Sequence, residues 1–250
     1  MHSKAISPHR LAGVYTDGVD LYTRSLVPGA LAAHGDVGAP VRGDNGHEYR
    51  PFPPNRTKLA AMVKRRVRAW PFTESSRVLY LGAGAGTTVS FVSDICARGT
   101  VIAVEFAPDP FRELVEVARA RPNVVPVLAD ARTPAAYRAH VGGHVDVLYQ
   151  DVAQRDQWDI LRRNADAFLA PDGRAVLVVK AKSVDVSVPA REVYEAVRRE
   201  VEGSDYEVVD FVELDPYERE HGAFVLCRRA MPASQGQRAR DGGPRGARAR

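Results

Sequence analysis

The chain has 250 residues and a formal net charge of +4, from 35 Lys and Arg against 31 Asp and Glu. This length is enough for one large α/β domain with a small extension, and no apolar run approaches the roughly 20 residues of a membrane-spanning helix, which excludes that class. From Ala230 onward five arginines and one acid, Asp241, give +4, so the other 229 residues are close to neutral and a strongly basic folded surface is not implied.

The amino terminus, MHSKAISPHR, lacks the apolar segment of a secretory signal, so we expect a cytoplasmic protein. Cys96 and Cys227 lie in apolar segments and form no CxxC or metal-ligand spacing, which predicts two buried, reduced thiols. His140 and His144 would share one face of a helix, but the two glycines between them favour a loop. No metal site is therefore predicted.

Residues 1–52 are predicted to form a small N-terminal β subdomain. Short apolar pieces alternate with turn signals at Thr16-Asp17-Gly18 and Pro28-Gly29, as in a small antiparallel sheet. The apolar pieces are Leu11 to Val14, Val19 to Tyr22, and Leu26 to Val27. This region contains no residue pattern that indicates chemistry.

A second, larger domain is predicted over residues 53–229. The segment from Pro51 to Asn55 cannot be helical and is expected to be a linker. An amphipathic helix is predicted from Arg56 to about Ala69. Lys58 lies in its first turn, where the helix macrodipole disfavours a cation.

From Arg77 the sequence alternates strands and helices, which predicts a doubly wound α/β fold with a seven-stranded, mostly parallel sheet. A short loop joins the last two strands, so they should pair as an antiparallel hairpin. Pro171-Asp172-Gly173 predicts a turn before a buried strand, and Pro189 suits a first helical turn. The predicted strands are 77–81, 101–105, 124–128, 145–149, 174–180, 206–213 and 223–228, and the predicted helices are 87–96, 109–120, 156–169 and 189–202. Residues 230–250 form an Arg- and Gly-rich tail that we expect to be disordered.

A glycine-rich turn follows the first of these strands, at Gly82, Gly84 and Gly86. Glycines there allow positive φ angles and let a ligand lie against bare backbone at the amino end of the next helix. Glu105 ends the next strand about 20 residues on, where it can accept hydrogen bonds from both hydroxyls of a ribose. The pattern favours a nucleoside-bearing cofactor. An ordinary tight turn and a dinucleotide site are the alternatives, although GxGxG lacks the third glycine of the dinucleotide fingerprint at its usual place.

Ligands of such sheets bind outside the carboxyl ends of the parallel strands. Five successive strand ends carry a glycine turn, three acidic positions and a lysine, at Gly82 to Thr88, Glu105-Phe106, Asp130-Ala131, Asp151 to Gln154, and Lys180 to Lys182. Because the turn has no Arg or Lys, a cofactor with positive groups fits better than a pyrophosphate. S-adenosylmethionine, with a ribose diol, an ammonium and a sulfonium, meets this requirement.

Six segments, in this order, resemble the fibrillarin family, and the archaeal form in length and layout: VLYLGAGAGTTVSFVSDI, VIAVEFAP, NVVPVLADAR, VDVLYQDVAQ, VVKAKSVD and DPYEREHG. The resemblance covers about residues 45–229, and YLGAGAGTTVS and DVAQ are its most specific runs. It implies a class I S-adenosylmethionine-dependent methyltransferase fold. The implied activity is methylation of ribose 2′-hydroxyls in rRNA and tRNA, directed by box C/D guide RNAs in a ribonucleoprotein.

The resemblance also implies a cofactor site. Thr87 and Thr88 would hold the cofactor in the glycine loop, Glu105 would bind its ribose, and Phe106 would lie against its adenine. Asp130-Ala131 would lie at the adenine edge and Asp151 to Gln154 near the methionine part. The full implied set is Gly82, Ala83, Gly86, Thr87, Thr88, Glu105, Phe106, Asp130, Ala131, Asp151, Val152, Ala153 and Gln154.

The catalytic set implied by the resemblance is lysine, aspartate, lysine and a histidine. The matching positions are Lys58 in NRTKLAA, where the family usually shows RSKLAA, then Asp151, Lys180 in VVKAKS, and His221 in YEREHG. Lys182 competes with Lys180, but it matches a variable position of the motif and ranks below it.

These residue types suit methyl transfer, which is an in-line displacement that needs an aligned hydroxyl and removal of its proton. A lysine that is desolvated and crowded by a second cation can act as a base. We therefore hypothesise that Lys180 is the base, that Asp151 orients it, and that Lys58 fixes RNA or acts on Lys180.

The resemblance further implies several partners: guide and target RNA, a Nop-family scaffold protein and a kink-turn-binding protein of ribosomal type. A nearly neutral folded body that cannot hold RNA tightly alone agrees with such dependence. The alternatives are a non-catalytic assembly subunit of the same particle, a protein-glutamine methyltransferase, and a nicotinamide-dependent oxidoreductase, for which we find no hydride-transfer motif.

Overall fold

The computed structural model describes residues 5–29 and 37–230. An N-terminal sheet of five short antiparallel strands has the order β1-β2-β3-β5-β4. Its strands are β1 (Ser7–Pro8), β2 (Val14–Thr16), β3 (Leu21–Arg24), β4 (Val41–Arg42) and β5 (Glu48–Pro51). In the predicted turn between β2 and β3, the Asp17 side chain accepts hydrogen bonds from the amides of Val19 and Asp20. The predicted small β subdomain is confirmed, but Leu26 to Val27 is not a strand.

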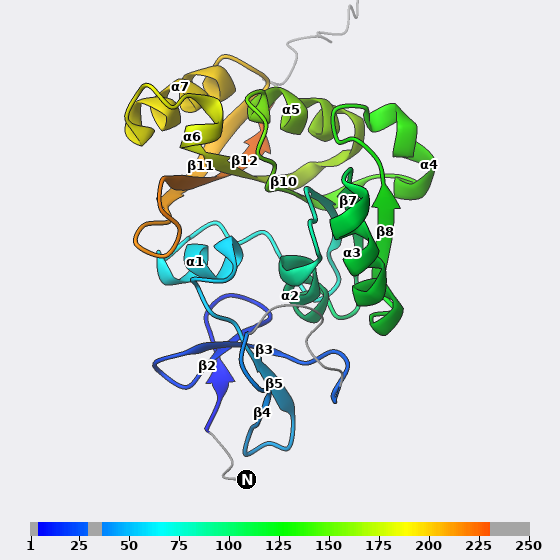
Figure 1. Ribbon diagram of the computed structural model, residues 1–250. Coiled ribbons are helices and arrows are strands. Elements are labelled where there is room, and N and C mark those ends of the chain that lie inside the picture. Colours follow the sequence, from blue (N-terminus) through cyan, green and yellow to red (C-terminus); the bar gives the residue numbers. More distant parts are fainter. Residues whose placement is uncertain (1–4, 30–36, 231–250) are drawn as a thin grey trace, which may run out of the picture.

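The large sheet has seven strands in the order β11-β12-β10-β9-β6-β7-β8. Five adjacent strands pair in parallel, in the order β10, β9, β6, β7 and β8. Strand β12 is antiparallel to both β10 and β11. The strands are β6 (Arg77–Leu81), β7 (Thr100–Glu105), β8 (Val124–Leu128), β9 (Val145–Gln150), β10 (Leu169–Lys180), β11 (Tyr206–Glu213) and β12 (His221–Arg228). This is the predicted doubly wound, mostly parallel architecture (Figure 1).

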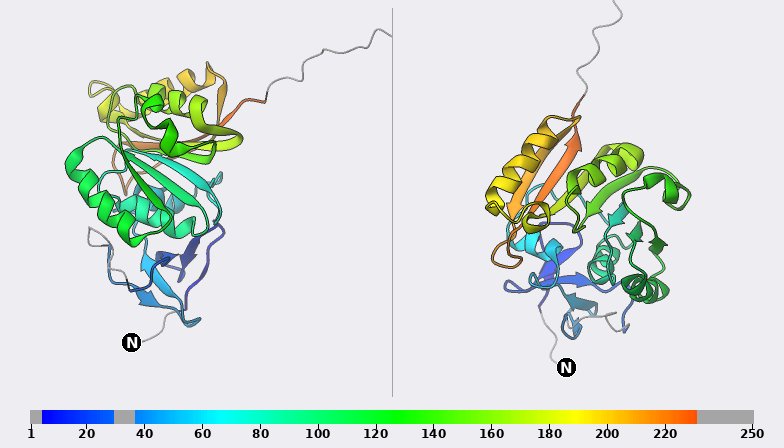
Figure 2. Two further views of the ribbon diagram at one scale, coloured as in Figure 1. Left: turned by 90° about the vertical axis from the view of Figure 1, so that its right-hand side faces the viewer. Right: turned by 45° about the horizontal axis from the view of Figure 1, so that its top comes forward.

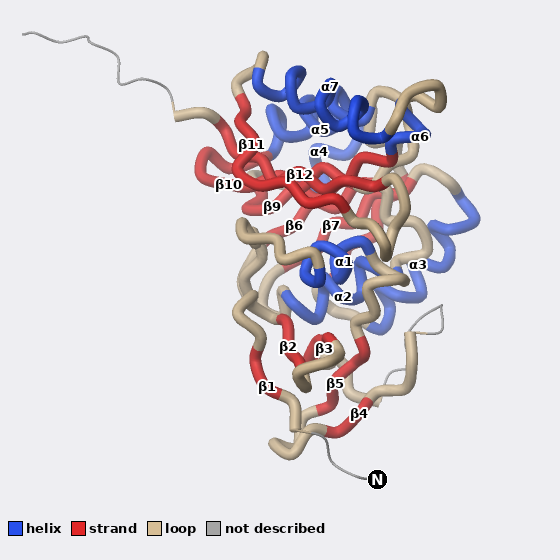
Figure 3. The backbone as a smooth tube through the Cα atoms, turned by 90° about the vertical axis from the view of Figure 1, so that its left-hand side faces the viewer, coloured by secondary structure: helices blue, strands red, loops and turns tan. Residues whose placement is uncertain are grey.

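Helices cover both faces of this sheet (Figure 3). One face packs on α1 (Lys58–Lys64), α2 (Thr87–Ile95) and α3 (Pro108–Ala120). The other packs on α4 (Arg138–Val141), α5 (Gln157–Phe168), α6 (Ala181–Val184) and α7 (Ala190–Glu202). Alternation along β10 explains the two cores, since Val176 and Val178 belong to the first and Leu177 and Val179 to the second.

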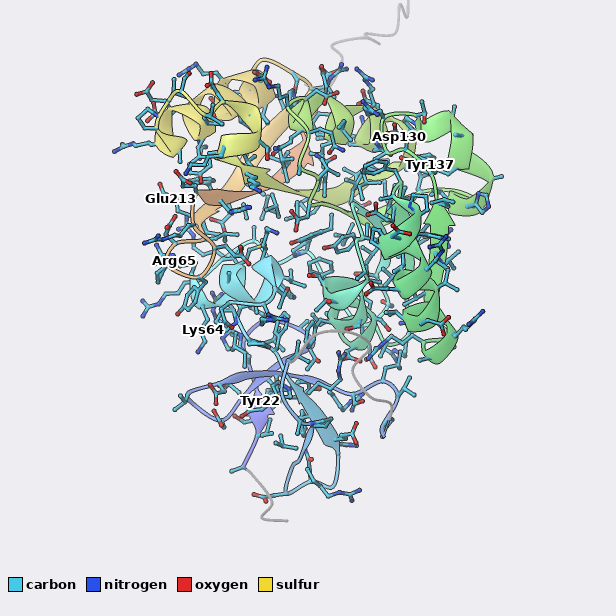
Figure 4. The ribbon with its side chains drawn as sticks, viewed as in Figure 1. Tyr22, Lys64, Arg65, Asp130, Tyr137 and Glu213 are labelled. Atoms are coloured by element: carbon cyan, nitrogen blue, oxygen red, sulfur yellow. The ribbon has the colours of Figure 1, made fainter. Side chains whose placement is uncertain are left out.

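The predicted helix over residues 56–69 is too long, because α1 ends at Lys64. Arg66 has a φ of 63°, which breaks the helix, and the amides of Arg68 and Ala69 donate to the buried Asp210 carboxylate of β11. Figure 4 shows Arg65 next to Glu213 of β11, whose carbonyl accepts a hydrogen bond from the Arg65 guanidinium. The carboxyl end of α1 is therefore fixed to the β11 edge.

Strand β10 also begins earlier than predicted, at Leu169 instead of 174. Its pairing with β9 shifts register between Leu169 and Arg174, and the predicted turn Pro171-Asp172-Gly173 lies in this irregular stretch. From Arg174 onward the pairing is regular, so the part of the strand that leads to Lys180 was placed correctly.

A buried ion cluster joins the N-terminal sheet to α2. Asp94 of α2 pairs with Arg50 of β5 at 2.5 Å and with Arg121 at 2.7 Å, and it accepts a hydrogen bond from Thr23 of β3. The Arg50 guanidinium also lies 4.5 Å from the centre of the Phe91 ring. Figure 2 shows the resulting arrangement from two sides, with the N-terminal sheet (blue) against the α1 and α2 side of the molecule.

Cys96 and Cys227 are free, buried thiols, as predicted. Within the described ranges no helix has the length and apolar character to cross a membrane, and no group of His, Cys, Asp and Glu side chains could hold a metal ion. The predicted Arg-rich tail, from 231 onward, lies outside the described residues.

Candidate active site

The carboxyl ends of β10, β9, β6, β7 and β8 lie next to one another at one edge of the sheet, in that order. The predicted site residues follow these ends: Lys180 closes β10, Asp151 to Gln154 follow β9, the glycine loop follows β6, Glu105 closes β7, and Asp130-Ala131 follow β8. Parallel pairing therefore brings together segments that are far apart in the sequence.

Close packing explains the glycines of the loop. A side chain at Gly82 would place its Cβ 2.3 Å from the carbonyl oxygen of Asp151, and one at Gly86 would lie 2.9 Å from Leu114 and Val117 of α3. Both glycines have positive φ angles, of 78° and 87°. Gly86 is the N-cap of α2, so the helix begins at Thr87 directly behind the loop.

The loop is tied to the next strand by Glu105. This carboxylate is only 6% exposed, and its two oxygens each accept a backbone hydrogen bond of 2.8 Å, from Gly84 and from Ala107. Since a carboxylate has about four acceptor positions, Glu105 can accept two further donors in a fixed orientation. That is the requirement for holding a vicinal diol.

A pocket beside Glu105 is lined by six of the predicted cofactor residues: Gly82, Phe106, Asp130, Ala131, Val152 and Gln154. Its remaining walls are three apolar residues that were not predicted as cofactor residues, Val104, Ala129 and Ile160. Phe106 is 60% exposed. A mostly apolar lining that includes an aromatic ring is chemically suited to a flat heterocycle.

Two polar side chains, Gln154 and Asp130, line this pocket. The Gln154 Oε1 atom is buried and has no hydrogen-bond partner among the described residues, so it is an acceptor that a ligand donor would satisfy. The Asp130 carboxylate is bound by the Arg132 side chain, at 2.7 Å, and by the Arg132 amide, and these hydrogen bonds hold the pKa of Asp130 below its usual range. Asp130 therefore stays ionised at the pocket rim, near Tyr137 (Figure 4).

The other predicted cofactor residues, Ala83, Thr87, Thr88 and Ala153, surround the same edge. The amide of Ala83 donates to the Val104 carbonyl, and Thr87 and Thr88 form the first turn of α2. The Thr88 hydroxyl donates to Thr57, which precedes α1, and Ala153 is exposed in the loop after β9.

Lys58 and Asp151 form an ion pair with an Nζ to Oδ2 distance of 2.8 Å, and each side chain is 22% exposed. Lys58 is the first residue of α1 and Asp151 is the first residue after β9. Two tyrosines stack beneath the pair, Tyr80 and Tyr149, with ring centres 4.7 Å apart. Burial, with a smaller contribution from nearby Asp151, raises the pKa of Tyr80 far above its ordinary value, so the phenol stays neutral.

Lys180 and His221 are directly paired across β10 and β12. Alternation places both side chains on the α1 side of the sheet, in line with Val178 and Ala223 of the same core. Asp151 continues the Val147 and Tyr149 row on that side. All four predicted catalytic side chains thus come from one face at one sheet edge.

His221 and Lys182 bind different partners near the end of β10. His221 Nδ1 lies 2.7 Å from the carbonyl oxygen of Arg219 and donates a hydrogen bond to it. Lys182 pairs instead with Glu220 at 2.8 Å, on the exposed surface. This pairing separates Lys182 from the other lysines.

Comparison with known proteins gives one consistent result. The family model described as Fibrillarin matches residues 6–230. A fibrillarin-like rRNA/tRNA 2'-O-methyltransferase of Methanopyrus kandleri is 44% identical over 204 residues, which cover 81% of this chain and 86% of that protein.

Two solved structures are similar over nearly their whole length. Aeropyrum pernix fibrillarin in complex with natively bound S-adenosyl-L-methionine is 39% identical, with a TM-score of 0.80 and coverage of 90% of this chain and 99% of that chain. A chain of a fibrillarin/Nop5p complex is 38% identical, with a TM-score of 0.79 and coverage of 89% and 100%.

Proposed function

Because the chain belongs to the fibrillarin family, we propose that it is an S-adenosylmethionine-dependent enzyme that methylates ribose 2′-hydroxyls of rRNA and tRNA as the catalytic subunit of a guide-RNA particle. Its doubly wound sheet is the class I methyltransferase fold. The observation that carries the proposal is the Lys58–Asp151 ion pair, which lies on the same sheet face and edge as Lys180 and His221, beside the glycine loop.

The residues of the glycine loop and the pocket fit this cofactor. Glu105 has acceptor capacity for the ribose diol. The mostly apolar pocket that includes Phe106 suits adenine. The Gln154 Oε1 atom, which has no partner among the described residues, can accept a hydrogen bond from an amino group. When bound, S-adenosylmethionine supplies a methyl group on a sulfonium, which is the electrophile of the reaction.

The chain's own residues hold the acceptor hydroxyl and accept its proton. Lys180, which is exposed at the end of β10, is the proposed base: its neutral amine accepts the proton as the oxygen begins to bond to carbon. Asp151 orients the lysines, and Lys58, held by Asp151, fixes the RNA beside the reacting hydroxyl. His221, held by the Arg219 carbonyl, lies opposite Lys180 at the same end of the sheet.

Target choice is assigned to the partners. A Nop-family scaffold agrees with the similarity to a chain solved in complex with Nop5p. Box C/D guide RNA and a kink-turn-binding protein complete the proposed particle. The nearly neutral folded body supports this division, because a protein without a large excess of positive charge binds RNA weakly at moderate salt.

The test combines the purified protein, labelled S-adenosylmethionine, and a guide and target RNA, with and without the Nop-family and kink-turn proteins. Methylation of one guided 2′-hydroxyl only in the complete mixture is the expected result. Cofactor binding with no RNA product would contradict it and would favour an assembly subunit. Label on a protein glutamine would favour a protein methyltransferase.

A further inference from the structure

Thr57 occupies the N-cap of α1, immediately before Lys58. Threonine at this position normally uses its hydroxyl to accept a hydrogen bond from an amide in the first turn of its own helix. Thr57 makes no such bond, although it is only 2% exposed and its carbonyl accepts the amide of Ala61 as an N-cap should. Its hydroxyl is therefore used elsewhere.

The hydroxyl of Thr57 accepts a long hydrogen bond from Thr88, with 3.4 Å between the two Oγ1 atoms. Thr88 lies in the first turn of α2, directly behind the glycine loop. The bond spans two helices that are 31 residues apart, so the start of α1 is attached to the start of α2.

The partner of Lys58 is attached to the same loop from the other side. The amide of Asp151 donates to the carbonyl of Leu81, and its own carbonyl oxygen fills the space that a side chain at Gly82 would need. Asp151 thus contacts the loop with its own backbone, whereas Lys58 is connected to the helix behind the loop through its neighbour Thr57.

Lys58 needs such a support. It is the first residue of its helix, the first turn contains no acidic residue, and the positive end of the helix dipole repels its ammonium. Asp151 offsets this repulsion only while the two side chains face each other at 2.8 Å.

From this arrangement we infer that Thr57 is a positioning residue: its hydroxyl, held by Thr88, sets the direction of Lys58 toward Asp151 and so fixes the catalytic pair relative to the cofactor loop. The inference rests on the proposed function for its effect on turnover. Its geometric part concerns the protein alone.

The test compares Thr57→Val, which keeps the branched shape and removes the hydroxyl, with Thr57→Ser, which keeps the hydroxyl. In the guided methylation assay Thr57→Val should lower kcat about tenfold, while KM for S-adenosylmethionine and for RNA stays within about twofold. Thr57→Ser should restore kcat to within about twofold of the unmodified protein. An unchanged kcat in Thr57→Val, or equal losses in both variants, would overturn the inference.

A second readout does not depend on turnover. Crystal structures of the two variants without cofactor should show the Lys58 to Asp151 distance lengthened in Thr57→Val and retained near 2.8 Å in Thr57→Ser. An intact pair in Thr57→Val would overturn the positioning role. If the unmodified protein fails to methylate guided RNA, the proposed function fails, and this structural comparison still decides the inference.

Discussion

The ammonium of Lys58 lies 2.8 Å from the carboxylate of Asp151 across 93 residues of sequence. The pair connects the first residue of α1 to the end of β9, and neither of its residues lines the cofactor pocket. Lys58→Met should therefore lower kcat about a hundredfold while the Kd for S-adenosylmethionine changes less than about threefold. Single-turnover methylation and calorimetric titration measure the two quantities. Lys64→Met, at the other end of the same helix, is the control and should keep its activity.

The two lysines at and just after the end of β10, Lys180 and Lys182, should differ in their effect on turnover. Lys180→Met removes the proposed base and should abolish turnover with cofactor binding retained, whereas Lys182→Met removes only an exposed pair with Glu220 and should keep kcat within about twofold. Both variants can be assayed in the reconstituted particle. Full activity of Lys180→Met would refute the assignment, and loss in Lys182→Met alone would transfer the role to that residue.

Glycine substitutions in the loop test its packing. Gly82→Ala forces a Cβ against the Asp151 carbonyl at 2.3 Å and should cost roughly 2 to 3 kcal/mol of unfolding free energy and most of the cofactor affinity. Gly84→Ala has no atom within 4 Å and only the strain of its φ of 53°, about 1 kcal/mol. Urea denaturation measures the free energy of unfolding of both variants. Equal losses would show that backbone strain, not the contact with Asp151, decides the effect.

The buried cluster around Asp94 should control the attachment of the N-terminal sheet. Arg50→Met leaves a charge on Asp94 with one ionic partner fewer, and it should destabilise the protein by about 3 kcal/mol. Arg24→Met breaks an exposed pair with Glu74 at 3.9 Å and should cost less than about 1 kcal/mol. Urea unfolding and limited proteolysis within residues 5–51 distinguish them, and equal stability of the two variants would contradict the buried role.

The Cys96 thiol predicts a dependence of stability on alkaline pH. Burial, with a smaller effect of Asp146, raises the pKa of Cys96 to about 12, whereas an unfolded thiol titrates near pH 8.5. Between these values only the unfolded chain loses the proton, so stability falls as pH rises above about 8.5. From pH 8 to 9.5 the loss should be about 1 kcal/mol larger in the unmodified protein than in Cys96→Ala. Parallel urea curves of the two proteins at both pH values measure it, and equal slopes would contradict it.

The large sheet could be predicted because each of its elements has a local signature. Apolar runs of strand length, glycine turns and amphipathic helices alternate from Arg77 onward, and right-handed parallel connections leave little freedom in how they assemble. The sheet edge that carries Gly82, Glu105 and Asp151 follows from the same rule, so the location of the candidate site was predictable.

The sequence-based predictions are wrong where long-range contacts determine the local structure. Periodicity extended α1 to Ala69, but Asp210 of β11 binds the backbone there and ends it early. Leu26 was predicted in the N-terminal sheet, but its amide binds Asp94 instead. The bond between Thr57 and Thr88 has no sequence signature, since a threonine before a helix predicts an ordinary cap.

Strand β12 is the last element of the described residues, but it lies inside the large sheet. This last strand lies between β10 and β11, and its first residue, His221, stands opposite Lys180. Lys58, Asp151 and Lys180 all precede it in the chain, so the sheet that carries these three candidate residues is completed only once residues 221–228 have been made. A chain that ends before residue 221 therefore lacks the strand that pairs with both β10 and β11, and it leaves β10, which ends at Lys180, without that neighbour.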